Sequence, residues 1–576
     1  MKYTPFLLLV LLFGCGNATK GDAEFETFSQ HFIENLWKQN PGWATSVGYH
    51  KYDSILTIPN EENRQKSLTF STQYLDSLKQ FDFEKLSKTH QTDYLILENY
   101  LKSNSFYINE FKSFEWDPSG YNFGETLFKI MSNKEAKPAD IITNLNKFLS
   151  NTNAYFTAAK QNIKNPTREH TELALSQLKG TKEMLEKGDI ASFFDAQKSE
   201  KTQLLASIKD IDGFLEFLQD QLNKIDAGKI KPRSYSIGKE LFTKKFDYEI
   251  QSKFTAEEIY NKALARKKEI QGEMYSYASK LWTKYYPNTP LEKDSMLCVQ
   301  KVIDAACKSH VNRDQFLAEI ERQIPILTEF VTSKNLIDMD PTKPLKVRKE
   351  PEWMAGVAGA SISSPGPYEK NENTYYNVGT LAHYSAEEAE SFLREYNQYM
   401  LQILNIHEAI PGHYVQLIHA NKSPSMIQNI MGNGAFIEGW AVYSERMMME
   451  EGWDKNTSIN ATESSDEMWL FYLKWHLRAA CNTILDYSVH CKNISKEDAM
   501  NLLVKEAFQQ PAEAEGKWRR ATLSQVQLCS YFTGYTDIYE FRQGLKNKDK
   551  KFNLKEFHNK LLSFGSPPLK YIEKMY

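Results

Sequence analysis

The sequence is poor in the residues that build several common kinds of protein site. Its 576 residues include only six cysteines and twelve histidines, and no Cys-x-x-Cys pair occurs. A zinc site built from thiolates is therefore not expected. Five cysteines follow Cys15, an odd number, and their spacing specifies no disulfide pairing.

An excess of charge and long apolar runs are also missing. The 70 basic and 74 acidic side chains leave a formal net charge of -4, and no basic stripe carries interleaved aromatic residues. Nucleic acid is therefore not an expected partner. Beyond the first fifteen residues, no stretch is long and apolar enough to cross a membrane. The 41% hydrophobic and 25% charged residues are typical of a folded, globular chain.

The N-terminus is a separate segment with the features of an export signal. Lys2 precedes an apolar run over residues 6–13, which is too short for a permanent membrane helix. The run ends in Leu12-Phe13-Gly14-Cys15, which resembles a bacterial lipobox, a motif whose cysteine carries lipid. We expect a signal peptide over 1–15, a tether over 16–23, and a periplasmic or surface-exposed protein of the bacterial envelope, anchored to a membrane through Cys15. The alternative is an ordinary secretory signal with an incidental cysteine.

The remaining chain is predicted to be mainly α-helical. Its length exceeds that of one ordinary core, so two or more lobes are expected, with a candidate boundary around 229–236. Capping boxes at Thr255-x-x-Glu258 and Ser385-x-x-Glu388 predict further helix starts. Apolar residues recur at helical spacing in four clear segments, residues 25–38, 140–163, 171–187 and 202–225.

One segment departs from the helical pattern. Proline, glycine and asparagine cluster over 351–379, and aromatic and polar residues alternate around 375–379. This pattern predicts a short strand or hairpin beside the site. An extended peptide could pair with its edge by strand addition, which makes Tyr376 and Asn377 candidate substrate-binding residues.

The segment His407-Glu408-Ala409-Ile410-Pro411-Gly412-His413 carries the strongest chemical signal. A zinc hydrolase needs neutral imidazoles as ligands and a nearby carboxylate as a base. Neighbouring side chains on a helix point about 100° apart. His407 can therefore face a metal while Glu408 faces the attacking water.

The spacing of the two histidines is unusual. Zinc-binding helices commonly carry histidines at i and i+4, whereas His407 and His413 stand at i and i+6, about 600° apart on a straight helix. Pro411 removes a backbone donor and Gly412 permits unusual dihedral angles. A bulged turn that absorbs two residues would return His413 to His407. Otherwise the helix ends at Pro-Gly, and His413 is an ordinary surface or core histidine.

Downstream residues offer a third ligand and supporting groups. Glu438 lies 25 residues beyond His413, which leaves room for a turn and a returning helix, and Glu445 shares its helical face. Asp486 and His490 stand at i and i+4 in an apolar segment, where polar groups usually serve a partner. The plainer alternatives are exposed helix charges and a satisfied buried pair.

At these residues the sequence resembles the DUF885 family of bacterial proteins. The resemblance covers most of the mature chain. Five motifs carry it: Pro41-Gly42-Trp43-Ala44-Thr45-Ser46-Val47-Gly48 with Asp53; His407 to His413 followed by Gln416; Glu438-Gly439-Trp440-Ala441 with Tyr443 and Glu445; Asp486-x-x-x-His490; and Ser530-Tyr531-x-x-Gly534.

The resemblance implies a fold and a set of roles. The fold would be a mainly α, zincin-like helical two-lobed metallopeptidase, with an N-terminal lobe over 24–240, a catalytic lobe over 241–576, and a small β hairpin or sheet near the active-site helix. His407, His413 and Glu438 would be the zinc ligands, and Glu408 would be the general base. His490 and Tyr531 would stabilise the oxyanion. Glu445 and Asp486 would hold these site residues in position.

Two departures from the family pattern concern the substrate side of the site. Tyr414 stands where many relatives carry a second histidine. Residues 521–528 replace a frequent Pro-Gly-Gln-Ala segment, and Gln527 takes the place of its glutamine as a candidate substrate-binding residue.

The expected function is that of a zinc-dependent peptidase, with Glu408 as general base towards a peptide substrate. The alternatives are a zinc amidase acting on cell-wall peptides and a helical binding lipoprotein without catalysis.

Overall fold

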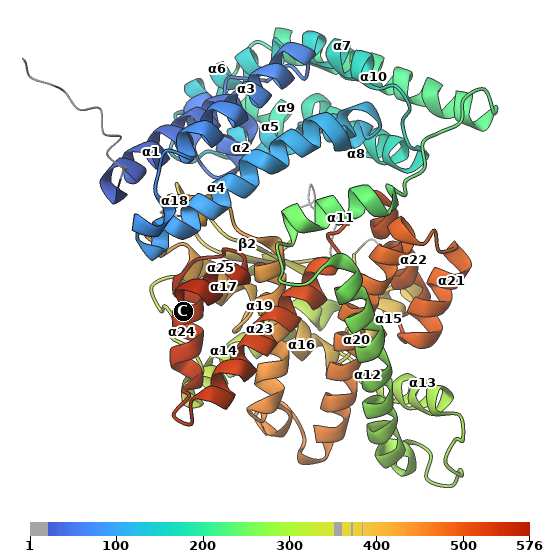
Figure 1. Cartoon of the computed structure of the whole chain (residues 1–576). Helices are drawn as coiled ribbons and strands as arrows, with labels where there is room; N and C mark the ends of the chain where they lie inside the picture. Colours follow the sequence, from blue (N-terminus) through green and yellow to red (C-terminus); the bar gives the residue numbers. More distant parts are fainter. Residues whose placement is uncertain (1–20, 351–359, 370–371, 383) are drawn as a thin grey trace, which may run out of the picture.

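The computed structural model describes residues 21–350, 360–369, 372–382 and 384–576. The predicted signal peptide, Cys15 and most of the predicted tether lie outside the described residues. Within the described part, no helix combines the length and apolar character that crossing a bilayer requires. The chain is mainly helical with one small sheet (Figure 1), which confirms the predicted mainly α class.

The first ten helices form the upper layer of Figure 1, drawn in blue to green. Their apolar faces build a core of their own within residues 56–225, and a second core joins α1, α3 and α4 to α18 and α25 below. The bounds are α1 Asp22–Gln39, α2 Pro41–Ser46, α3 Glu61–Leu78, α4 Lys88–Phe106, α5 Gly124–Met131, α6 Pro138–Leu149, α7 Thr152–Asn162, α8 Arg168–Glu186, α9 Asp189–Ala196 and α10 Thr202–Asp226.

The later helices build the lower body around the largest core. Their bounds are α11 Gly238–Glu249, α12 Ala256–Tyr285, α13 Ser295–Ala306, α14 Phe316–Ser333, α15 Ala386–Glu395, α16 Met400–Glu408, α17 His413–Ala420, α18 Met426–Ile430, α19 Gly434–Glu450, α20 Ser465–Cys491, α21 Lys496–Met500, α22 Pro511–Leu523, α23 Cys529–Lys548, α24 Leu554–Ser563 and α25 Leu569–Met575.

Local sequence explains several helix ends. Both predicted capping boxes are present, with Thr255 opening α12 and Ser385 opening α15. The segment predicted as one helix over 140–163 is two helices, because α6 ends at Leu149 and α7 restarts at Thr152. The division into lobes at 24–240 and 241–576 stays a prediction.

Helix α20 is buried along nearly its whole length, as expected for a helix that is apolar on all sides. Helices α19 and α23 pack backbone to backbone beside it. A Cβ on Gly439 would lie 2.3 Å from the carbonyl carbon of Gly534, and one on Gly534 would lie 1.7 Å from the carbonyl oxygen of Ala435. Only glycine permits this approach, which brings the residues of both helices to one site.

The sheet has three strands, β1 Lys346–Lys349, β2 Ala360–Ser363 and β3 Tyr375–Val378, in the order β1-β3-β2. Strand β3 pairs in parallel with β1 and antiparallel with β2, so that Tyr376 is opposite both Val347 and Ile362. The strand predicted around 375–379 is therefore confirmed, but it is the central strand of the sheet.

Candidate metal centre

The two histidines of the motif lie on either side of a break between two helices. Helix α16 ends at Glu408 and α17 begins at His413, with a cis peptide bond between Ile410 and Pro411 in the connecting turn. The expected bulge inside one continuous helix is therefore wrong. Two separate helices joined by this turn instead bring the two imidazole rings to 4.8 Å between centroids.

Gly412 permits this tight turn. Its N–H donates to the carbonyl oxygen of Ile406 at 2.9 Å. A Cβ at position 412 would lie 1.8 Å from the carbonyl oxygen of His407, inside van der Waals contact with the backbone. A residue with a side chain would force the turn open and move His413 away from His407.

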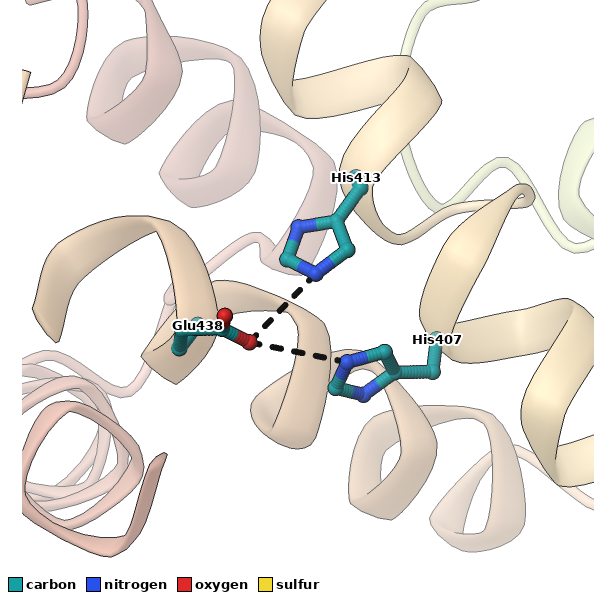
Figure 2. A group of neighbouring side chains, drawn as sticks. All are labelled: His407, His413 and Glu438. Atoms are coloured by element: carbon teal, nitrogen blue, oxygen red, sulfur yellow. Dashed lines mark ion pairs between the residues drawn. The ribbon is translucent and has the colours of Figure 1, made fainter. Parts of the chain in front are cut away.

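Helix α19 supplies the third side chain. Its N-cap residue, Asn433, accepts a hydrogen bond from the N–H of Phe436, which fixes the start of the helix one turn before Glu438. Oε2 of Glu438 lies 3.7 Å from Nε2 of His407 and 3.5 Å from Nε2 of His413. Figure 2 shows the three side chains converging on one point, and one ligand atom from each lies within 4.8 Å of the others.

The spacing of these atoms fits a metal ion. Two atoms that bind one zinc tetrahedrally at about 2.0–2.1 Å lie roughly 3.4 Å apart. The separations from Glu438 to the histidines are close to this value and longer than a hydrogen bond. Oε2 of Glu438 is buried and has no hydrogen-bond partner among the described residues. Two imidazoles and a carboxylate are also a donor set that zinc prefers.

The electrostatics of the three residues point in the same direction. Burial lowers the pKa of His407, but the carboxylates of Glu438 and Glu445 outweigh it and raise the pKa to about 10. Burial raises the pKa of Glu438, and the two histidines more than reverse this, leaving it well below its usual range. The two carboxylates thus favour positive charge at the histidines.

Glu445 supports His407 from the side opposite the metal position. Its fully buried Oε1 lies 2.7 Å from Nδ1 of His407 and accepts a hydrogen bond from Nε1 of Trp475 at 2.8 Å. A carboxylate at Nδ1 favours the tautomer that leaves Nε2 free for a metal. The predicted supporting position of Glu445 is thus present.

Glu408 and the three converging side chains line one cavity of about 930 Å³. Burial raises the pKa of Glu408, which makes it a stronger base than a free carboxylate. Leu173 and Gln177 of α8 also line the cavity, which therefore lies between the upper layer and the lower body. Strand β2 contributes Ala360, Ser361 and Ile362 to the same lining.

Tyr531 lies on the wall beside the histidines. Its ring stacks over that of His407, with 6.4 Å between centroids and 21° between planes. Burial and the charge of Glu438 raise the pKa of Tyr531 to about 12, so the hydroxyl keeps its proton. Arg520 donates to the Tyr531 oxygen at 3.0 Å and to Oε1 of Gln527 at 2.6 Å. The Tyr531 oxygen accepts the bond from Arg520, so the tyrosine's own proton can serve as a donor.

A family model with the description "Bacterial protein of unknown function (DUF885)" matches residues 41–575. The chain belongs to this family. One solved structure similar to this DUF885 protein is a candidate lipoprotein of unknown function from Shewanella oneidensis. It is 45% identical, has a TM-score of 0.84, and the match covers 96% of this chain and 99% of that chain.

A second solved structure, a candidate lipoprotein from Colwellia psychrerythraea, is 16% identical with a TM-score of 0.75. The match covers 96% of this chain and 98% of that chain, and it shows a shared fold alone. No curated protein matches the DUF885 chain. Family membership confirms the resemblance drawn from the motifs and supplies no activity.

In this DUF885 protein, two side chains that were predicted to belong to the site contact the main chain instead. Nε2 of His490 lies 2.9 Å from the carbonyl oxygen of Ala521 and 3.1 Å from that of Ser524. Asp486 accepts hydrogen bonds from the N–H groups of Val526 and Leu528. Among the described residues neither side chain lines the cavity.

The pair therefore holds residues 521–528, the segment that leads into α23 and Tyr531. The prediction that His490 stabilises an oxyanion and that Asp486 backs a ligand is corrected accordingly. The alternative of a satisfied buried pair describes their surroundings better. Polar side chains in an apolar helix correctly predicted that Asp486 and His490 have partners. Those partners are main-chain groups.

The predicted substrate contacts of β3 are also corrected. The Tyr376 hydroxyl donates to Oδ1 of Asn405 at 2.8 Å, and Oδ1 of Asn377 accepts from Nε of Arg348 at 2.7 Å. Both side chains are fully buried, and β3 is paired on both sides. It therefore has no free edge for a peptide. Gln527 lies behind the wall against Arg520 and is outside the described cavity lining.

Sequence reasoning missed the wall formed by α20 and α22. This wall contributes Trp475, Arg478, Glu513, Lys517 and Arg520 to the cavity. Arg478 interrupts the apolar run of α20, which was the available signal. The residues of α22 carry no such signal, because a helix rich in charges usually faces solvent.

Proposed function

We propose that this protein is a zinc-dependent peptidase that hydrolyses peptide bonds with Glu408 as general base. The observation that carries the proposal is the convergence of His407, His413 and Glu438 beside Glu408 in a large cavity. Zinc bound there would lower the pKa of its water towards about 7 and polarise the scissile carbonyl. In general plan the proposed enzyme is a zincin-like, two-lobed metallopeptidase.

The side chains of this chain have separate roles in the proposal. Glu408 takes a proton from the attacking water and delivers it to the leaving amine. The Tyr531 hydroxyl donates a hydrogen bond to the developing oxyanion, while Arg520 holds the tyrosine oxygen in place. Glu445 keeps the His407 ring oriented. His490 takes no part in this scheme.

The edge of the sheet formed by β2 also has a proposed role. Strand β2 lies at the edge of the sheet and lines the cavity through Ala360, Ser361 and Ile362. A substrate peptide in extended form can pair with such an edge through main-chain hydrogen bonds. In this proposal β2 replaces β3 as the strand that aligns the substrate.

The proposed location is the bacterial envelope, with a lipid on Cys15 as the membrane anchor. The motif Leu12-Phe13-Gly14-Cys15 supports this location. The solved relative from Shewanella oneidensis, 45% identical, is described as a candidate lipoprotein, which supports it independently.

Metal analysis and peptide turnover of the detergent-purified full chain test the function. We expect one zinc per chain and cleavage within a mixed peptide library followed by mass spectrometry. Glu408→Gln preserves shape and removes the proton-accepting charge, so this variant should retain zinc while turnover falls at least ~10²-fold. Full turnover by zinc-loaded Glu408→Gln would overturn the mechanism. A zinc-loaded wild type that cleaves no peptide would instead favour a binding lipoprotein, and cleavage of cell-wall peptides alone would favour an amidase.

A further inference from the structure

The cavity wall formed by α20 and α22 is strongly positive. Helix α20 contributes Arg478, and α22 contributes Lys517, Arg519 and Arg520. Within the described lining, Glu513 is the one acidic residue that these two helices provide. This wall therefore carries several more positive than negative side chains.

Two of these positive groups have little contact with water and incomplete pairing, since the Arg478 side chain is 17% exposed and that of Lys517 only 5%. Nη2 of Arg478 pairs with Oε1 of Glu513 at 2.6 Å, and its guanidinium stacks over Trp475 at 4.9 Å. Its Nη1 is buried and makes no hydrogen bond of ordinary length to the described residues, although Tyr396 and Glu395 lie near enough to favour its charge. An acceptor on a ligand in the cavity would complete this donor.

Lys517 is the second such group. Its side chain is only 5% exposed, and its Nζ lies 3.8 Å from Oε1 of Glu513, beyond hydrogen-bond distance. Burial and the neighbouring charges of Arg478 and Arg520 lower the pKa of Lys517 to about 7. An anion bound beside this amine would restore its charge and relieve the repulsion between the three cations.

The positive wall adjoins the metal ligands. Tyr531, which stacks on His407, is bonded to Arg520. Trp475 donates a hydrogen bond to Glu445, which contacts His407, and the Arg478 guanidinium lies over the Trp475 ring. One intervening side chain therefore separates each arginine from the residues around the metal position.

We propose that Arg478, Lys517 and Arg520 bind the C-terminal carboxylate of a peptide substrate, so that the enzyme removes residues from the C-terminal end. This inference rests on the proposed peptidase function. Arginine and lysine bind carboxylates through charge-assisted hydrogen bonds. When the last peptide bond is cleaved, only the Cα of the C-terminal residue separates the scissile nitrogen from the terminal carboxylate. The carboxylate therefore lies close to the metal position, where the cationic wall adjoins the metal ligands.

A site for a free N-terminus would need the opposite charge. An ammonium group calls for unpaired acidic side chains, and Glu513 on this wall is already paired with Arg478. An acidic side chain of the substrate offers the same carboxylate chemistry as a C-terminus. The test must therefore separate these two sources of the carboxylate.

Binding to zinc-loaded Glu408→Gln provides a test without turnover. The probes are acetylated tetrapeptides of identical sequence that end in either a carboxylate or an amide, titrated calorimetrically into the detergent-purified full chain. We expect the acid form to bind about 10-fold or more tightly than the amide, as for a charged hydrogen-bonding group. Equal affinity for the two forms would overturn the inference, and this comparison requires no change to the wall.

Two substitutions in the Glu408→Gln background identify the residues involved. Lys517→Met should lower affinity for the acid form about 10-fold and leave the amide form unchanged. The matched control is Lys496→Met, because Lys496 of α21 is 53% exposed and pairs with Glu515 of α22, the helix that carries Lys517. We expect this control to bind both peptides as before. A third outcome is that amide peptides bind through Lys517, but only when they contain an internal Asp or Glu. The bound carboxylate would then be a substrate side chain, and the C-terminal assignment would be wrong.

Turnover by the wild type separates this inference from the proposed function. Successive loss of C-terminal residues from acid peptides, with amides spared, would support the inference. Equal cleavage of both forms would overturn the inference and leave the peptidase function in place. No cleavage of any peptide, together with acid-selective binding through Lys517, would overturn the peptidase function while retaining the carboxylate site.

Discussion

Nδ1 of His407 lies 2.7 Å from Oε1 of Glu445, and this contact determines which ring nitrogen faces the metal position. Glu445 is fully buried and also accepts a hydrogen bond from Trp475, so its carboxylate has little freedom to move. Nε2 of His407 is thereby directed towards Glu438 and His413.

Glu445→Gln should weaken zinc binding about 10–100-fold, as is typical for a partner of a metal ligand. The amide can still accept from Trp475, but it no longer favours the Nδ1–H tautomer through its charge. Competition with a chromogenic chelator measures the loss. Complete loss of zinc, as severe as that of His407→Ala, would show that Glu445 is itself a ligand.

Each of the three converging residues should be needed for zinc. We expect His407→Ala, His413→Ala and Glu438→Ala to lose metal more severely than Glu445→Gln, because each removes one of three protein ligands. Metal content after dialysis measures the effect, with Glu408→Gln as the control that retains zinc. Full occupancy in His413→Ala would rule out the pair separated by six residues.

Gly412→Ala should damage the site without touching any ligand. The added Cβ would lie 1.8 Å from the carbonyl oxygen of His407, so the turn must open and His413 must move. We expect loss of zinc and a lower unfolding temperature. Gly544→Ala in α23 is the matched control, because a Cβ there meets nothing within 4 Å and should stabilise the helix by about 0.5–1 kcal/mol. Normal zinc affinity in Gly412→Ala would contradict the close approach.

His558 should make the protein less stable in acid. Burial lowers its pKa to about 3, while its unfolded value is near 6.5. As pH falls from 6.5 towards 3, the unfolded chain gains a proton that the folded chain does not, so stability decreases by up to about 1.4 kcal/mol per pH unit.

Urea unfolding at several pH values between 7.5 and 4.5, with chelator present, measures this effect. His558→Gln should show a shallower dependence by about that slope. The quantity to compare is the difference in unfolding free energy between the wild type and His558→Gln at each pH. Buried carboxyls such as Asp537, whose pKa burial raises to about 7, change the stability in the opposite sense and cancel in this difference. Parallel curves would show that His558 is not a buried neutral group.

Cys15→Ala tests the membrane anchor. If Cys15 carries lipid, as its place at the end of Leu12-Phe13-Gly14-Cys15 predicts, the variant should leave the membrane fraction or accumulate unprocessed. Fractionation and the mass of the mature N-terminus measure the outcome. Unchanged processing and membrane association would favour an ordinary secretory signal.

The helices and the group of converging side chains were accessible from the sequence because both depend on local chemistry. Apolar spacing and capping boxes predicted helices such as α8, α10 and α12, since a helix must bury one face and satisfy its first N–H groups. The break between α6 and α7 was missed because the apolar pattern runs through it.

By itself, the sequence determined the family, the mainly helical class, and the identity of His407, His413 and Glu438 as one group. Residue types and spacing pointed to the histidines, and the resemblance to the family selected Glu438 as their partner. The tertiary structure alone decided that His490 binds main-chain carbonyls, that β3 is the central strand, and that Lys517 of α22 lines the cavity. These facts depend on contacts between segments far apart in the chain, and the register of such contacts follows from the packing of the whole core.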